Sequence, residues 1–186
     1  MQPTLLSTNS GIAVIPVMVE HAATLAALIR QDSEHLHAFL PMVATLSTFD
    51  AARGHLERAA VRAADGEIFE WHLFMGDALC GSVRVKDIDH DDRKASIGYF
   101  VGTQFTGKGI VTSALRVVLA WCFETLGLNR IELRCATSNA PSIRVAERLG
   151  FVREGLLRQD ECLHGVFVDY YVYSLLKSEF GRGIDD

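Results

Sequence analysis

The distribution of apolar and polar residues along the chain predicts both strands and helices. Residues 12–19 are rich in β-branched side chains, which is typical of a strand, and Leu25, Leu28 and Ile29 then recur at helical spacing. Residues 33–50 mix a short helix with a loop that a proline interrupts. The N-terminal part of the chain is therefore expected to be a strand followed by helices.

The remaining segments extend this order to β-α-α-β-β-β-α-β-α-β-β, which predicts an α/β protein built on a mixed sheet. Asp50 is a natural cap for the second clear helix, in which Leu56, Ala60 and Val61 fall on one face. The expected strands are 12–19, 68–75, 78–88, 94–102, 130–137, 151–159 and 167–176, and the expected helices are 20–30, 50–65, 109–127 and 140–149.

The composition fits a single domain over residues 1–186. With 49% hydrophobic and 22% charged residues the chain can bury one core, and no change of composition divides it. A net charge of −5 argues against a general nucleic-acid binder, which needs a basic surface. Four widely spaced cysteines, together with no evident signal peptide or membrane span, favour a cytoplasmic protein with reduced thiols.

The segment "GTQFTGKGIV" (102–111) resembles a P-loop but has Gly109 where a magnesium-binding hydroxyl should stand. The strands before it form hairpins, and no later strand ends in the aspartate that would hold the metal, so magnesium-dependent hydrolysis is disfavoured. The segment joins a strand to the longest helix, whose first amide groups and dipole suit a phosphate or pyrophosphate. The alternatives are a mobile turn for the segment and a solvated role for Lys108.

A second polar notch is expected in "CATSNAPSIRVAERLGF" (135–151), where another strand meets another helix. Asn139 can cap that helix, and Pro141 is tolerated in its first turn. Ser142 lies one turn into the helix and, on structural grounds alone, is an ordinary helix serine. In a sheet that places the two strands side by side, this notch would neighbour the glycine segment.

Three segments together resemble the GCN5-related N-acetyltransferases (GNAT), and more narrowly their RimJ/RimL-type branch: "FTGKGIVTSAL", "NAPSIRVAERLGFVREG" and "EGLLRQDECLHGVFVDYYVYSLL". The likeness covers about residues 11–177. It implies a mixed sheet of about seven strands with four helices, in which strands 94–102 and 130–137 splay apart to form an acetyl-CoA cleft. Members of the branch acetylate ribosomal-protein N-termini and other amines.

The resemblance also implies which residues bind the cosubstrate. In the family motif [QR]-x-x-G-x-[GA], Thr106 takes the first place, Gly109 the central one and Val111 the last, and the first and last depart from the usual residues. Backbone amides would hold the pyrophosphate, and the strand before them would pair with the pantetheine arm, with Asn139 on the opposite wall. The implied set is Phe100, Val101, Thr106, Gly107, Lys108, Gly109, Ile110, Val111, Thr112 and Asn139.

Two catalytic residues follow from the same resemblance. Many family members use a tyrosine as the acid for the departing thiolate, but Ala146 stands at that position, and Ser142 matches the serine of the RimL-like arrangement. Glu161, between the last two strands, matches a candidate base, with Asp160 as a substitute. An acidic residue in a β-turn is, however, usually just a solvated charge. Direct attack by the amine needs no covalent intermediate and no metal, and none of the histidines has metal-ligand spacing.

The function expected is therefore acetyl transfer from acetyl-CoA to a primary amine, first of all a protein N-terminal α-amine. Residues 33–49 would form one lip of the acceptor site. A polyamine or aminoglycoside-like amine is the alternative acceptor, and a non-catalytic acyl-CoA-binding protein is the alternative class. The apolar final strand is compatible with a homodimer.

Overall fold

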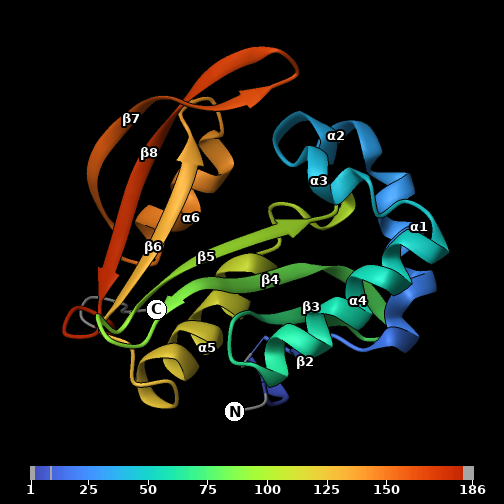
Figure 1. The fold of residues 1–186 in the computed structure, drawn as a ribbon, viewed down its shortest axis with the longest axis horizontal. Helices are drawn as coiled ribbons and strands as arrows, with labels where there is room; N and C mark the ends of the chain where they lie inside the picture. The colour runs from blue at the N-terminus through green and yellow to red at the C-terminus, as the bar shows by residue number, and fades with distance from the viewer. Residues whose placement is uncertain (1–2, 9, 182–186) are drawn as a thin grey trace.

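The computed structural model describes residues 3–8 and 10–181, in which eight strands form one mixed sheet (Figure 1). Their order across the sheet is β1-β2-β3-β4-β5-β6-β8-β7, and only β5 and β6 pair in parallel within the described chain. The strands are β1 Leu6–Ser7, β2 Ile12–Pro16, β3 Phe69–Met75, β4 Ala78–Asp89, β5 Lys94–Val101, β6 Arg130–Ala136, β7 Val152–Leu163 and β8 Val166–Leu176. The expected mixed sheet is confirmed, with the short β1 as an additional strand.

Helices cover both faces of the sheet. Successive residues of a strand point to opposite faces, so β3 identifies the two sides. Trp71 stacks edge-on against Trp121 of α5, with the ring centroids 5.0 Å apart, whereas Glu70 contacts His55 of α4 on the opposite face. The helices are α1 Ala22–Gln31, α2 Ser33–Phe39, α3 Pro41–Ala44, α4 Phe49–Ala64, α5 Ile110–Glu124 and α6 Ala140–Arg148, with 3₁₀ turns η1 Val19–His21 and η2 Thr103–Phe105.

The expected number of four helices is too low. In the described residues, α2 and α3 form separate helices within the segment expected to hold one short helix and a loop. They are separated at Leu40, whose backbone angles (φ −139°, ψ 63°) are not helical, and the following Pro41 disfavours a helical conformation there. The last two strands are also longer than predicted, because β7 continues to Leu163.

The cap of α4 is Thr48 and not Asp50. Thr48 has extended backbone angles, and its hydroxyl accepts a hydrogen bond from the Ala51 amide at 3.3 Å. Asp50 lies within the first turn instead, where its negative charge is favourable toward the helix dipole. The inner face of α4 also differs from the predicted one, and Val61 is 63% exposed. The buried residues of α4 are Ala52, Leu56, Ala59 and Ala63.

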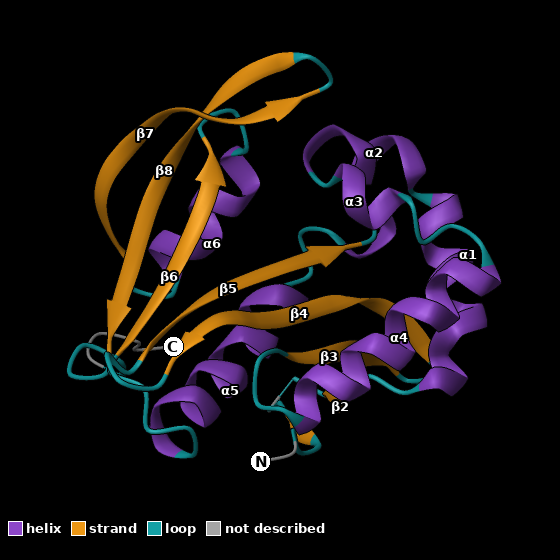
Figure 2. Cartoon of the chain, in the orientation of Figure 1, coloured by secondary structure: helices purple, strands orange, loops and turns teal. Residues whose placement is uncertain are grey.

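The divergence of β5 and β6 is the feature of this fold that matters for function. Their parallel ladder runs over Lys94–Arg130, Ala95–Ile131 and Ser96–Glu132, and beyond it neither strand pairs with the other. From there the sheet opens into a V, with β1 to β5 on one arm and β6, β8 and β7 on the other (Figure 2). The predicted splaying of these two strands is confirmed.

Candidate functional site

The glycine segment begins where β5 ends and forms the N-terminus of α5. Gly107 and Gly109 have φ angles of +74° and +73°, in the left-handed region that favours glycine. A side-chain carbon added at either position would meet no atom within 4 Å, so backbone conformation, not crowding, explains these glycines. Gly109 caps α5 and has no side chain, so the first amides of the helix, from Ile110 to Thr112, keep the anion-binding character of a helix N-terminus.

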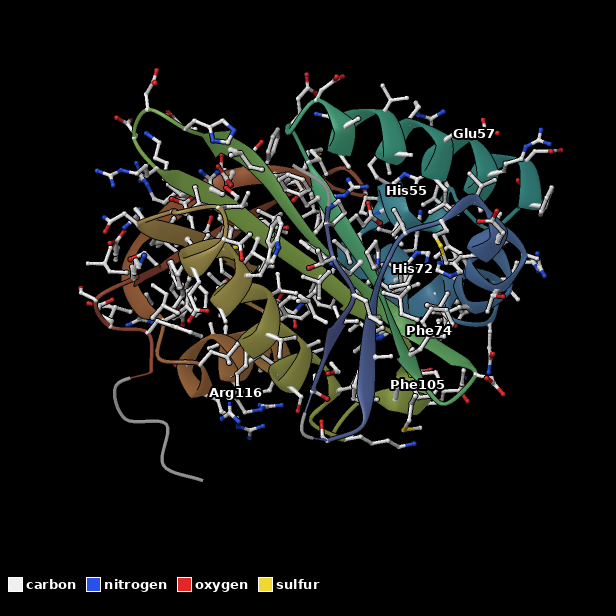
Figure 3. All side chains as sticks on the ribbon, turned by 90° about the horizontal axis from the view of Figure 1, so that it is seen from below. His55, Glu57, His72, Phe74, Phe105 and Arg116 are labelled. Carbon is white, nitrogen blue, oxygen red and sulfur yellow. The ribbon has the colours of Figure 1, made fainter. Side chains whose placement is uncertain are left out.

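Phe105 anchors this segment to the body of the protein (Figure 3). Its side chain is buried, and the Lys108 ammonium lies 5.6 Å from the centre of its ring. The Thr106 hydroxyl donates to the carbonyl of Thr103 at 2.8 Å, so this side chain closes the loop on itself. Lys108 and Thr106 are both exposed. Lys108 is thus an exposed cation of this loop, and the Thr106 hydroxyl serves to hold the loop together.

Within the described part of the chain, no strand pairs with the end of β5 on the side of β6. Phe100 and Val101 pair on their other side with Ser82 and Gly81 of β4. At Gly81 a side-chain carbon would lie 2.1 Å from the Phe100 carbonyl oxygen, which shows how closely the two strands approach. Unpaired backbone groups on a strand edge are a template for hydrogen bonds from another extended chain.

Ser142 joins the two arms of the V through its hydroxyl. Its Oγ lies 2.9 Å from the Tyr99 hydroxyl on β5 and 3.2 Å from the Cys135 sulfur on β6. The Ser142 amide donates to Asn139 Oδ1 at 3.2 Å, which confirms Asn139 as the cap of α6. Burial raises the pKa of Tyr99 well above its ordinary value, and the hydrogen bond with Ser142 opposes this only in part. Tyr99 therefore stays protonated at neutral pH.

Sequence reasoning did not single out Tyr99. The alternation of residues along the strand could have indicated it. Tyr99 points to the same face of the sheet as Ile97, which is the face that α5 covers, whereas Phe100 points to the opposite face. Ala146, which occupies the usual tyrosine position, is completely buried and has no polar atom to offer. Tyr99 of β5 is therefore a different tyrosine, which reaches Ser142 where β5 and β6 diverge.

Glu161 lies in β7 and not in a turn, which corrects the sequence interpretation. It is paired with Val168, and the turn between β7 and β8 falls at His164 and Gly165. Its Oε2 accepts a hydrogen bond from the Tyr170 hydroxyl at 2.6 Å. Burial and the adjacent Glu161 carboxylate together raise the pKa of Tyr170.

A bulge in β7 sets the position of Glu161. Between the pairs Leu157–Tyr170 and Glu161–Val168, β7 contains two more residues than β8. Gln159 has a φ of +54° in this bulge, and its amide donates to Asp169 Oδ1 at 2.8 Å. Asp160 instead faces Arg134, whose Nη1 lies 3.5 Å from Asp160 Oδ2.

Ser142 and Glu161 lie on opposite faces of this arm of the sheet. Glu161 contacts Tyr170, whereas Cys135, which contacts Ser142, pairs with the next residue of β8, Tyr171. Adjacent strand residues point in opposite directions. A group that meets both Ser142 and Glu161 must therefore lie in the region where β5 and β6 have separated.

The two arms also touch at their far ends. The rings of His37 in α2 and His164 in the β7–β8 turn have centroids 4.3 Å apart, and His164 Nε2 lies 2.8 Å from the His37 carbonyl oxygen. Figure 1 shows the turn reaching toward α2. The segment expected to be an acceptor lip thus borders the strand that carries Glu161.

A largely buried polar cluster, which includes His55 and His72, lies under α4 (Figure 3). Burial would raise the pKa of Glu70, but hydrogen bonds and charges from His55 and Arg84 outweigh it and bring the pKa to about 2. His72 is completely buried beside His21, and burial lowers its pKa to about 3. The cluster holds β3, β4 and α4 together.

The geometry defines a protein with a divergent parallel pair of strands, a glycine-rich helix N-terminus at its mouth and a hydroxyl cluster inside. Such an arrangement fits an extended thioester that carries a pyrophosphate, because the edge, the amides and the hydroxyl each meet one of its parts. No three His, Cys, Asp or Glu side chains among residues 3–8 and 10–181 are arranged to hold a metal ion. No helix in the same residues is long and apolar enough to cross a membrane.

Comparison with known proteins identifies the class. Residues 12–152 match the acetyltransferase (GNAT) domain family. The chain is 35% identical over 173 residues to the putative ribosomal N-acetyltransferase YdaF of Bacillus subtilis, covering 92% of this chain and 94% of that protein.

Two solved structures share the fold. Mycobacterium smegmatis RimJ, in complex with CoA-disulfide, has a TM-score of 0.88 at 25% identity and covers 98% of this chain and 93% of its own. The microcin C7 self-immunity acetyltransferase MccE, in complex with acetyl-CoA and AMP, has a TM-score of 0.85 at 28% identity, with 90% and 93% covered.

The chain belongs to the GNAT acetyltransferase family and is similar to its RimJ/RimL-type members. It is an acetyl-CoA-dependent N-acetyltransferase. The resemblance inferred from the three sequence segments, the fold and the cosubstrate are all confirmed.

Proposed function

We propose that this enzyme acetylates the N-terminal α-amine of a protein, with ribosomal proteins as the class of acceptor. The observation that carries the transfer reaction is the Ser142 hydroxyl, held between Tyr99 and Cys135 where β5 and β6 diverge. Similarity to a putative ribosomal N-acetyltransferase supports the class of acceptor. The reaction is a direct attack of the amine on the thioester, and no covalent enzyme intermediate is required.

The cosubstrate is bound mainly by backbone groups. The amides from Gly107 to Thr112 hold the pyrophosphate at the start of α5, where the helix dipole favours negative charge. Phe100 and Val101 offer their free strand edge to the amides of the pantetheine arm. Oδ1 of Asn139 accepts a hydrogen bond from the Ser142 amide, and its side-chain NH₂ and the second lone pair of Oδ1 can contact that arm.

Ser142 supplies the proton or hydrogen bond that the departing thiolate needs. The Tyr99 hydroxyl keeps its proton at neutral pH because burial raises its pKa. It can therefore donate to Ser142 while Ser142 donates to the sulfur of the departing thiolate. The chain of two hydroxyls replaces the tyrosine that is missing at Ala146. Tyr99 thereby becomes part of the proposed acid side of the reaction.

Glu161 acts as the base on the acceptor face. An α-amine has a pKa of about 7.7–8, so its deprotonation at neutral pH costs only about 1 kcal/mol, against roughly 4–5 kcal/mol for a lysine. Glu161 is exposed, and among the residues that the structure describes its one direct partner is the Tyr170 hydroxyl at 2.6 Å. A weakly placed base of this kind suits an α-amine better than a lysine side chain.

The contact between His37 and His164 bears on the size of the acceptor. These residues bridge the arms on the side of α2 and the β7–β8 turn. An extended peptide end would have to enter beside this bridge, and so would a small primary amine such as a polyamine or aminoglycoside. A small amine is therefore the second candidate acceptor. A homodimer and a cytoplasmic location stay predictions.

Release of free thiol from acetyl-CoA tests the proposal. The acceptor panel contains ribosomal-protein N-terminal peptides, the same peptides with a blocked α-amine and an internal lysine, spermidine, an aminoglycoside and a no-amine control. We expect the free α-amine peptides to give the highest kcat/KM. Faster turnover of spermidine or the aminoglycoside selects the small-amine function. If the protein binds CoA but no amine increases thiol release, a non-catalytic acyl-CoA-binding role replaces both.

A further inference from the structure

Asp32 stands at the junction of α1 and α2, and its side chain is used in an unusual way. The residue occupies the N-cap position of α2, where an aspartate normally accepts a hydrogen bond from the first turn of the helix. The Asp32 side chain makes no such bond to α2, although α2 lies wholly within the described residues. The residue is only 5% exposed, so its carboxyl group must find partners elsewhere.

Those partners belong to the segment that follows β5. Thr103 donates its backbone amide to Asp32 Oδ2 at 3.1 Å and its hydroxyl to Oδ1. Gly102 makes this approach sterically feasible. A side-chain carbon there would lie 2.6 Å from Asp32 Oδ2 and 2.8 Å from Leu28 Cδ1.

The contact continues directly into the loop proposed to bind the pyrophosphate. The Thr103 carbonyl accepts from the Thr106 amide at 3.1 Å and from the Thr106 hydroxyl at 2.8 Å. Thr106 is the residue immediately before Gly107. The Asp32 carboxyl group thus fixes Thr103, and the Thr103 carbonyl holds the loop through Thr106. The buried Phe105 side chain anchors the same loop.

We propose that Asp32 is a positioning residue. From the acceptor side of the enzyme, it fixes the conformation of the loop between β5 and α5, here called the cofactor loop. The inference rests on the proposed function, since it takes residues 107–112 as the pyrophosphate site. Asp32 begins α2, and His37 of the same short helix touches the β7–β8 turn near Glu161. The cofactor loop and the acceptor lip therefore share one rigid element. Asp32 acts through Thr103 and touches neither substrate.

The experiment compares four variants, with CoA itself as the binding probe. Asp32→Ala removes both contacts, and Thr103→Val removes the hydroxyl contact alone. Asp32→Asn retains an acceptor for the Thr103 amide and can donate to the hydroxyl, and Thr103→Ser retains the hydroxyl. Asp65→Asn, which removes an exposed carboxyl group at the end of α4, is the matched control.

We expect Asp32→Ala to raise the dissociation constant of CoA and the KM for acetyl-CoA about tenfold, since a lost hydrogen bond to a charged group is worth about that factor. Thr103→Val should raise both about threefold. The kcat at saturating substrates should change by less than about twofold, because the reacting groups stay in place. Asp32→Asn, Thr103→Ser and Asp65→Asn should remain near wild type.

Several results would overturn the proposal. An unchanged dissociation constant for CoA in folded Thr103→Val and Asp32→Ala would do so, as would a loss confined to kcat. An equal rise in the dissociation constant of CoA in Asp32→Asn and Asp32→Ala would also count against the proposal. If Asp32→Ala does not fold, Thr103→Val and its serine counterpart decide the question. CoA titration needs no acceptor, so a wild-type protein that turns over no amine would reject the proposed function while this test still stands.

Discussion

The two arms of the V are built differently, and the difference shows where stability and turnover reside. In the N-terminal arm, β3 is buried from Phe69 to Leu73, and Phe69 and Trp71 each pack edge to face against Trp121. In the C-terminal arm, most of β7 is exposed. Ser142 and Glu161, the proposed acid and base, come from the C-terminal arm, and most of the proposed cosubstrate site comes from the N-terminal arm.

Charge pairs on the C-terminal arm do not compensate for its small core. Arg130 and Glu154 approach to 2.6 Å, and Arg134 and Glu132 to 2.8 Å, but these side chains are partly exposed. Ion pairs in such positions contribute about 1 kcal/mol or less each. We therefore expect substitutions in the N-terminal arm to change the free energy of unfolding, and substitutions in the C-terminal arm to change kcat.

The largest effect should come from Trp71→Ala. Trp71 is completely buried between β3 and α5, and truncation of such a side chain costs about 3–5 kcal/mol. The matched change in the other arm is Leu156→Ala, at a side chain that is 49% exposed, which should cost about 0.5 kcal/mol or less. Urea unfolding measures both. Equal losses in the two variants would refute the contrast between the arms.

Ser142→Ala should have the largest effect on turnover. Loss of a positioned proton donor should lower kcat about 100-fold, while the dissociation constant of CoA stays nearly constant. Tyr99→Phe should produce a smaller loss in the same direction, because Tyr99 acts through Ser142. Ser138→Ala, at an exposed position just before α6, is the control. Normal turnover in Ser142→Ala would remove the role assigned to it.

Acid should destabilise the N-terminal arm through its buried polar cluster. The pKa of His72 is lowered to about 3 from 6.5, so below pH 6.5 the unfolded chain binds a proton that the folded protein does not. Stability is then lost as the pH falls, by about 2 kcal/mol between pH 7 and pH 5. Glu70 adds a further loss between about pH 4.5 and its folded pKa of about 2.

His72→Gln should flatten the pH dependence of the unfolding free energy between pH 7 and pH 5. The exposed His90 provides the control, since His90→Gln should leave the slope unchanged. Unfolding curves in urea at several pH values measure the effect. An unchanged slope in His72→Gln would show that another group carries the acid sensitivity.

The parts of the site that were predictable from the sequence depend on neighbouring residues in the chain. Gly107 and Gly109 do adopt the left-handed conformation that glycine permits, and Asn139 caps α6 three residues before its partner amide. The helix expected over 109–127 was likewise found, as α5. The capping residue is harder to predict where two suitable side chains lie close together, as Thr48 and Asp50 do, because the backbone angles at the start of the helix decide between them.

The parts that were missed depend on distant segments. Asp32 meets Thr103 across 71 positions of the chain, and Tyr99 meets Ser142 across 43. No local pattern announces such contacts. Glu161 was placed in a turn because the bulge near Gln159 lengthens β7 relative to its partner strand, and a bulge of this kind leaves little trace in an alternation of apolar and polar residues.

The smallest effect should come from Glu161→Gln, and it should depend on pH. At low pH few acceptor α-amines are free, so loss of the base should lower kcat/KM several-fold, up to about tenfold. At high pH the amine is already deprotonated, and the variant should approach wild type. The measurement is kcat/KM for an N-terminal peptide from pH 6 to pH 9. Asp160→Asn is the matched change one residue away, where the carboxylate faces Arg134. A constant ratio of variant to wild type across this range would exclude Glu161 as the base, and a larger loss in Asp160→Asn would assign the role to Asp160.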